Sequence, residues 1–176
     1  MFGGIGLATV CVLPFLAWVP DEEMAPSFLA GDLVLILPVD AHDGDVVAVV
    51  DPLDPSRWTL RRVITVGGAV RYEDGVYYTA SAEPPRVLDM DRGADEIVRT
   101  EDAHLVRYTR QPVRWTLDET PVAEGTAFLG ADARDVAMDS RWWGAVPLQA
   151  LQGVVAVRVG KPTHPWRGWV SGRTAR

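Results

Sequence analysis

The stretch VAEGTAFLGADARDVAMDSRWWGAVP spans residues 122–147 and joins two kinds of sequence. Its first part contains TAFLG (126–130), a short apolar run of the kind that forms a buried β-strand. Its second part is dense in charged residues and carries the adjacent tryptophans Trp142 and Trp143 just before Gly144. This change of pattern predicts a strand that leads into an ordered, polar loop.

Short runs of β-branched and aromatic residues recur through the rest of the chain, and Pro, Gly and Asp separate them. This pattern is typical of β-strands joined by turns. In YEDGVYY (72–78), Asp74 and Gly75 predict a hairpin turn, whereas the polar segment 82–102 predicts an irregular surface loop or insertion. The expected fold is one mainly β domain over residues 19–160. Its expected strands are 32–39, 45–51, 59–66, 69–74, 76–80, 104–109, 126–130 and 154–160.

The N-terminal run MFGGIGLATVCVLPFLAW, residues 1–18, contains no charged residue. A membrane-spanning helix needs about 20 apolar residues, and Trp18 lies where interfacial aromatic residues gather. The run lacks the positive segment and the cleavage site of a secretory signal. It predicts an uncleaved single-pass anchor in contact with membrane lipid. A buried core helix is the alternative, and the glycines and Pro14 weaken any helix here.

The formal net charge of −7 argues against a nucleic-acid partner, which would select a basic face. Cys11 is the only cysteine, so no internal disulfide can form. The three histidines are scattered and fit no metal-binding spacing. The sequence therefore predicts neither a metal site nor a cofactor.

The C-terminal segment, residues 161–176, is a basic tail. It contains lysine and arginine but no acidic residue, and it includes Trp166 and Trp169. Such a segment suits an anionic lipid surface or an acidic groove on a partner. A loose, solvated terminus is the alternative.

Four segments, in this order, resemble the motifs of the type I signal peptidase family. PDEEMAPSFLAGDLVLI (20–36) is similar to P-S-G-S-M-x-P-T-L-x-x-G-D-x-V, and DGDVVAVVDP (43–52) is similar to G-D-V-V-V-F-x-x-P. LRRVITVGGA (60–69) is similar to K-R-V-I-G-x-P-G-D. The stretch 122–147 resembles V-P-E-G-x-x-F-x-x-G-D-N-R-D-x-S-x-D-S-R-x-x-G-x-V-P without a gap.

This resemblance implies a signal-peptidase-like β domain preceded by one N-terminal transmembrane helix. It also implies a single-pass protein of a bacterial inner (cytoplasmic) membrane, with the β domain on the periplasmic or outer face. Asp139 and Arg141 are expected to brace the loop behind the site by hydrogen bonds. The framework positions that the resemblance assigns are Met24, Pro26, Asp32, Arg62, Asp132, Arg134, Asp139, Ser140 and Arg141.

The same resemblance shows where this chain departs from the family. Glu23 stands at the position of the nucleophilic serine, Arg61 at that of the general-base lysine, and Ala137 at that of a supporting serine. Arginine stays protonated at neutral pH and cannot accept a proton. A carboxylate at position 23 repels the oxyanion that peptide cleavage must stabilise. The sequence therefore predicts a pseudo-peptidase without a catalytic residue.

An acid and a base at adjoining positions predict an ion pair between Glu23 and Arg61; two unrelated, solvated charges are the alternative. The expected function is that of an inactive structural or accessory subunit of a larger membrane complex, bound to an integral-membrane protein. The alternatives are a non-cleaving binder of extended or signal-like peptides and an active membrane signal peptidase of altered mechanism. Candidate interface residues are Trp18, Trp142, Trp143, Trp166 and Trp169.

Overall fold

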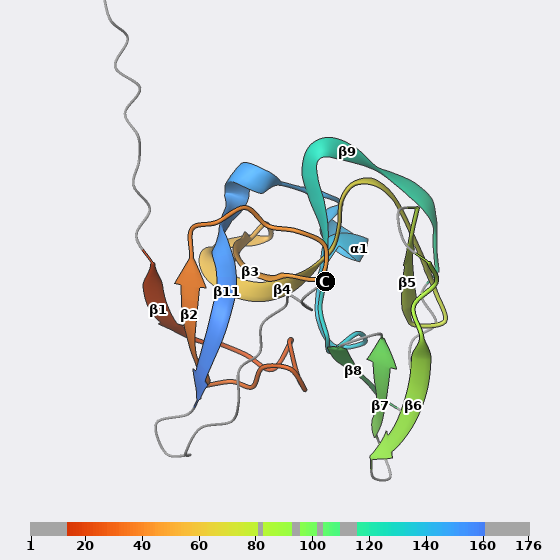
Figure 1. Ribbon diagram of the computed structural model, residues 1–176, viewed down its shortest axis with the longest axis horizontal. Helices are drawn as coiled ribbons and strands as arrows, with labels where there is room; N and C mark the ends of the chain where they lie inside the picture. The colour runs from red at the N-terminus through yellow and green to blue at the C-terminus, as the bar shows by residue number, and fades with distance from the viewer. Residues whose placement is uncertain (1–13, 81–82, 93–95, 102–103, 110–115, 161–176) are drawn as a thin grey trace, which may run out of the picture.

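The computed structural model describes residues 14–80, 83–92, 96–101, 104–109 and 116–160 (Figure 1). The elements of the first half are β1 (Phe15–Trp18), β2 (Leu33–Leu37), β3 (Val46–Asp51), β4 (Asp54–Glu73), β5 (Val76–Thr79) and β6 (Val87–Arg92). Those of the second half are β7 (Glu96–Glu101), β8 (His104–Thr109), β9 (Leu117–Gly130), α1 (Ser140–Trp143), β10 (Val146–Pro147), η1 (Leu148–Ala150, a 3-10 turn) and β11 (Leu151–Gly160).

The strands form two antiparallel sheets. The larger sheet has the order β1–β2–β11–β3–β4–β9–β10, with β5 paired to β4, and the smaller sheet has the order β6–β7–β8. In Figure 1, β1, β2 and β11 lie on one side of the molecule and β5–β8 on the other, with β9 arching between them. The long strands β4 and β9 pair with each other and so connect the two halves.

Side-chain alternation accounts for the core. Val34 and Ile36 of β2 point into one buried cluster, as expected for a strand with one face in the core. Strand β3 is buried on both faces, because Val46 contributes to that first cluster while Val47 contributes to a second. Its continuous apolar sequence predicts this position. A third cluster is built around Tyr77 and aromatic neighbours from β4 and β9.

The hairpin predicted between β4 and β5 is confirmed. Its two turn residues both have positive φ, 48° at Asp74 and 84° at Gly75, as a two-residue turn between antiparallel strands requires. The phenol of Tyr108 donates a hydrogen bond to the Gly75 carbonyl and so joins the smaller sheet to this turn.

Gly75→Ala is expected to destabilise the fold more than Gly125→Ala, although their φ angles, 84° and 77°, are similar. A Cβ on Gly75 would lie 2.7 Å from the Tyr108 ring, whereas a Cβ on Gly125 would meet nothing within 4 Å. Both variants lose about 1 kcal/mol through backbone strain, and only Gly75→Ala adds a clash of about 1–3 kcal/mol. Urea unfolding measures both losses, and equal losses would contradict this account.

The prediction of an irregular loop over 82–102 is wrong. This segment instead contains β6 and β7, which pair from Val87↔Glu101 to Arg92↔Glu96. The run EIVRTE contains the β-branched residues Ile97, Val98 and Thr100, which favour a strand, and Val98 is only 2 % exposed. Its polar composition therefore does not imply the absence of regular structure.

The predicted N-terminal helix over residues 1–18 is also wrong at its C-terminal end. Phe15–Trp18 is strand β1, and its register on β2 includes Trp18↔Leu33. The described part of the chain contains no helix with the length and apolarity to span a membrane. Residues 1–13, with Cys11, and the tail 161–176, with Trp166 and Trp169, lie outside the described residues.

Two predicted strands, 59–66 and 69–74, are one continuous strand, β4. The glycines between them, Gly67 and Gly68, have positive φ angles of 69° and 82°. The register of β4 on β9 shifts between Val66 and Gly68. The extra residues of this irregularity lie on β9, since Val66 pairs with Ala127 and Gly68 pairs with Val122. The glycines therefore let β4 bend while it stays paired, where the sequence pattern indicated a turn.

Candidate functional site

The chain between β1 and β2 positions Glu23. The backbone N–H of Val19 donates to the Asp32 carbonyl at 2.8 Å and ties the two ends of this segment together. Met24 is fully buried in the first core cluster, and the peptide bond before Pro26 is cis. Glu23 is therefore held beside a buried anchor, with 24 % of its side chain exposed to solvent.

Arg61 on β4 forms the predicted ion pair with Glu23, through Nη2 and Oε2. The Nε and Nη2 groups also donate to the Met138 carbonyl, at 3.0 and 2.6 Å. Nη1 donates to the Thr59 hydroxyl and to the Leu60 carbonyl, both at 2.6 Å. The Arg61 side chain is 1 % exposed. All five N–H groups of the guanidinium are thus matched by acceptors.

A smaller network of polar groups surrounds the pair. The buried Thr59 hydroxyl lies 3.4 Å from a carboxylate oxygen of Asp21 and equally far from one of Glu23. Asp21 also accepts the Glu23 backbone N–H at 3.1 Å and pairs with Arg57 at 3.4 Å. Each of these two carboxylates is therefore compensated by its own guanidinium.

The segment after β9 closes the site from the other side. Ala137 is buried, at 5 % exposure, and its methyl group offers no polar atom where a supporting hydroxyl was expected. The Trp143 ring centroid lies 5.2 Å from the Arg61 guanidinium carbon. A cation–π contact of this kind attracts the Arg61 guanidinium to the face of the Trp143 ring.

A second buried pair, Arg62 with Asp132, lies next along β4. The contact is bidentate, with Nε–Oδ1 at 2.9 Å and Nη2–Oδ2 at 2.6 Å. Ser27 donates its hydroxyl to Asp132 at 2.5 Å, so this serine belongs to the framework. Burial alone raises the pKa of Asp132, but the Arg62 charge and hydrogen bonds outweigh it and hold the pKa below its ordinary value.

Asp139 and Arg141 brace the loop as predicted. The fully buried Asp139 carboxylate accepts from the Arg141 Nε at 2.8 Å and from the Ala131 backbone N–H at 2.9 Å. Ser140 accepts the Leu129 backbone N–H at 2.9 Å. These bonds fix α1 against the end of β9 and hold the strand–loop junction in one conformation.

Glu101 is a buried partner that the sequence prediction missed. Its carboxylate accepts a 2.6 Å bond from Arg134, and the Tyr108 hydroxyl oxygen and His104 lie 3.1 and 3.6 Å away. Burial alone raises the pKa of Glu101, but the Arg134 charge and the contacts with His104 lower it overall to about 2. The β-branched residues of EIVRTE were the one signal that could have placed it on a strand.

The predicted interface tryptophans separate into three groups. Trp18 on β1 and Trp142 on α1 are about half exposed, at 52 % and 51 %. Trp143 is partly buried against the second core cluster and Arg61. Trp166 and Trp169 fall outside the described residues. Over the part of the chain that the structure describes, no group of three His, Cys, Asp or Glu side chains is placed to hold a metal ion.

Comparison with known proteins identifies the family. The family model described as signal peptidase, peptidase S26, matches residues 2–160. The chain therefore belongs to the signal peptidase family. Among solved structures, a signal peptidase I from Enterococcus faecalis is 22 % identical, with a TM-score of 0.45, and the match covers 66 % of this chain and 97 % of that one. A search of curated proteins found no match.

Proposed function

We propose that this protein is a catalytically inactive member of the signal peptidase family, acting as a structural or accessory subunit of a membrane complex. The observation that carries the proposal is the environment of Arg61. A general base must lose and regain a proton near the working pH. The Arg61 guanidinium is 1 % exposed, it is paired with Glu23, and each of its N–H groups has an acceptor. It therefore stays charged.

The same contacts support a selected arrangement over random loss of the catalytic pair. A lysine has three N–H donors at one atom and could not reach the Met138, Leu60 and Thr59 oxygens together. The chain has an arginine at this position and a carboxylate opposite it, and the surrounding hydrogen-bonding groups match both. We infer that the site was rebuilt as a structural link between the Glu23 segment, β4 and the loop after β9.

Glu23, which stands at the position of the nucleophile, supports the same conclusion. Its carboxylate is engaged by Arg61 and would give a reactive mixed anhydride with a peptide carbonyl. Ala137 supplies no hydroxyl to assist proton transfer. The framework pairs Arg62–Asp132 and Arg141–Asp139 are present. The fold is therefore retained without the groups that cleave a peptide bond.

The proposal includes location and partners. We place the protein in a bacterial inner membrane, attached through its apolar N-terminal residues, with the β domain on the outer face. The partner is an integral-membrane protein that contacts the exposed aromatic residues Trp18 and Trp142, which are about half exposed on the described surface. Aromatic residues are enriched in such contacts.

Gentle purification of the full chain from native membranes tests the subunit role. We expect a stoichiometric complex with an integral-membrane protein, which Trp142→Ala weakens and Leu88→Ala leaves intact; Leu88 is 69 % exposed on the smaller sheet. Recovery of the chain with lipid alone would contradict the subunit role. A transient peptide adduct in place of a protein partner would favour the non-cleaving peptide binder.

A further inference from the structure

One edge of β4 is unpaired within the larger sheet. Residues Trp58–Leu60 of β4 pair with Ala48–Val50 of β3 on one side. Strand β9 pairs with the other side of β4 only from Arg62 onward. Within the part of the chain that the structure describes, no strand therefore pairs with this second side over Trp58–Leu60, which we call the open edge. An open edge offers its backbone groups to an added strand.

The backbone carbonyl of Leu60 points toward the open edge. The Val63 N–H donates to the Asp45 carbonyl, on the side where β3 lies. Backbone groups alternate in direction along an antiparallel strand, so every second residue before Val63 also faces β3. The groups of Leu60 and Trp58 therefore face the open edge. The Leu60 carbonyl is thus an acceptor that an added strand would use.

Arg61 occupies this acceptor. Its Nη1 donates to the Leu60 carbonyl at 2.6 Å, so the guanidinium lies at the open edge. Its Nη2 pairs with Glu23 and donates to the Met138 carbonyl. The Arg61 side chain is 1 % exposed, because it is enclosed by the edge, the Glu23 segment and the loop after β9. A strand that paired with Leu60 would have to displace this buried charge.

Further contacts hold the Glu23 segment against the same stretch of β4. Arg57, Thr59 and Arg61 are alternate residues and so lie on one face of the strand. The Thr59 hydroxyl lies 3.4 Å from a carboxylate oxygen of Asp21 and equally far from one of Glu23. Arg57 pairs with Asp21 at 3.4 Å. Contacts at three successive positions of this face therefore fix Asp21 and Glu23 beside the open edge.

We propose that the Glu23–Arg61 pair blocks the addition of extended peptides to the open edge of β4. Sheets commonly protect an exposed edge with a charged side chain that points inward, and Arg61 does so here together with its counter-ion. The blocked edge is a latent site for an extended apolar peptide, because Leu60 belongs to the first core cluster and Trp58 packs against it. This role concerns peptide binding and does not depend on a membrane complex.

Peptide binding by variants of the full chain in detergent tests the block. Glu23→Ala/Arg61→Ala, the pair-deleted variant, removes the pair without changing the net charge. Arg71→Ala/Glu73→Ala is the matched control, since it removes an exposed ion pair of β4 at a point where β5 and β9 occupy the two edges. The probe is a fluorescein-labelled peptide that alternates valine and threonine over about six residues, the usual length of a strand. Fluorescence anisotropy measures its dissociation constant.

We expect the pair-deleted variant to bind the probe at least about tenfold more tightly than the natural chain and the control, the ratio that one or two added hydrogen bonds supply. A probe with methylated alternate backbone nitrogens cannot donate to the edge and should lose this gain. Arg61→Lys keeps a cation opposite Glu23 but frees the Leu60 carbonyl, so it should also show a gain. Circular dichroism confirms folding, and Arg61→Lys decides the test if the pair-deleted variant is unfolded.

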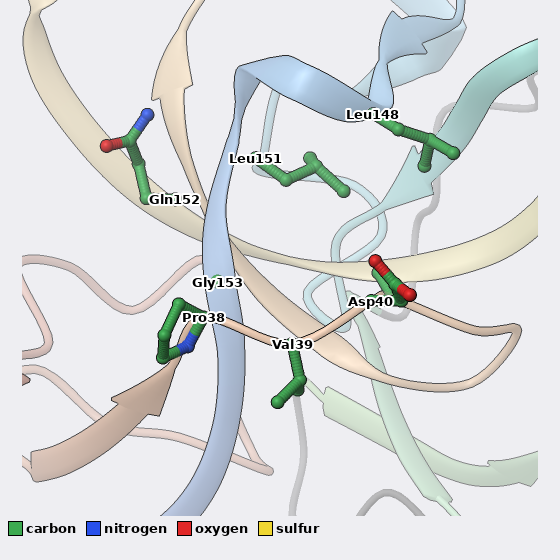
Figure 2. Close-up of a pocket in the computed structure, with 8 residues that line it drawn as sticks. Pro38, Val39, Asp40, Leu148, Leu151, Gln152 and Gly153 are labelled. Carbon is green, nitrogen blue, oxygen red and sulfur yellow. The ribbon is translucent and has the colours of Figure 1, made fainter. Parts of the chain in front are cut away.

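A cavity beyond the end of β2 is another apolar place that the probe could occupy. It has a volume of about 290 Å³, and Figure 2 shows Leu148 and Leu151 among the side chains that line it. None of its lining residues belongs to β4. Binding in the cavity would therefore be equal in the natural chain, the control and the pair-deleted variant.

Three outcomes would overturn the proposal. The first is equal binding by the natural chain and the folded variants of Arg61, which would mean that Arg61 blocks nothing. The second is an equal gain with the methylated probe, which would mean that no strand is added. The third is an equal gain in the control, which would assign the effect to the loss of any ion pair on β4.

Discussion

Glu23→Leu alone is expected to lower the free energy of unfolding by about 3–5 kcal/mol, because it leaves the buried Arg61 cation without a counter-charge. Adding Arg61→Leu is expected to recover part of that loss, since the double variant no longer buries an unpaired charge. Carbonyl oxygens that Arg61 now satisfies limit the recovery. Denaturant unfolding of both single variants and the double variant measures the coupling between the two side chains.

The exposed neighbour provides a matched control. Arg57 pairs with Asp21 at 3.4 Å but is 50 % exposed, so Arg57→Ala should cost no more than about 1 kcal/mol. If the Glu23 and Arg61 losses simply add in the double variant, the two side chains act independently. The inference of a selected ion pair would then be wrong.

Acid is expected to weaken the fold in part through Glu101. The folded state depresses the pKa of this carboxyl from 4.5 to about 2. Its stabilising contribution is therefore present above about pH 4.5 and is lost as the pH falls toward 2. That difference in pKa corresponds to about 3 kcal/mol of the free energy of unfolding. Unfolding measured between pH 7 and pH 2 should show the loss in this window.

Glu101→Gln distinguishes this group from the other carboxyls. The variant should be less stable than the natural protein at pH 7 and should lose less further stability between pH 4.5 and pH 2. Glu73, which pairs with Arg71 on the surface and is 53 % exposed, is the matched control. Glu73→Gln should leave the pH dependence unchanged. If the free energy of unfolding falls equally for Glu101→Gln and for the natural protein between pH 4.5 and pH 2, the acid sensitivity belongs to other groups.

The residues of the site were predicted from the sequence more accurately than the secondary structure around them, and the reason is physical. Glu23 and Arg61 fall within motifs that keep their order and register, so the family resemblance placed them together, and the ion pair followed from their charges. The Glu101–Arg134 pair was missed because Glu101 lies in a segment outside those motifs. Only the pairing of β7 with β6 and β8 brings it to Arg134.

The errors in the fold come from local patterns that tertiary pairing overrides. FLAW (15–18) continues an apolar run that suits a helix, yet its residues pair with Leu33–Ile36 and become an edge strand. The glycines at 67 and 68 look like a turn but lie at a bend within β4, which stays paired with β9. Composition alone cannot distinguish these outcomes, since what decides each is a partner strand far away in the sequence.

Cleavage of a signal-peptide substrate by the full-length, detergent-solubilised protein at neutral pH tests the central claim most directly. A signal peptidase that retains the serine and lysine is assayed in parallel as a positive control. Because active enzymes accelerate such reactions by at least about a million-fold, even a small remnant of activity would be visible. We expect no product above the buffer blank. Cleavage that Glu23→Ala abolishes would contradict the account, because it would mean that the carboxylate held by Arg61 takes part in catalysis.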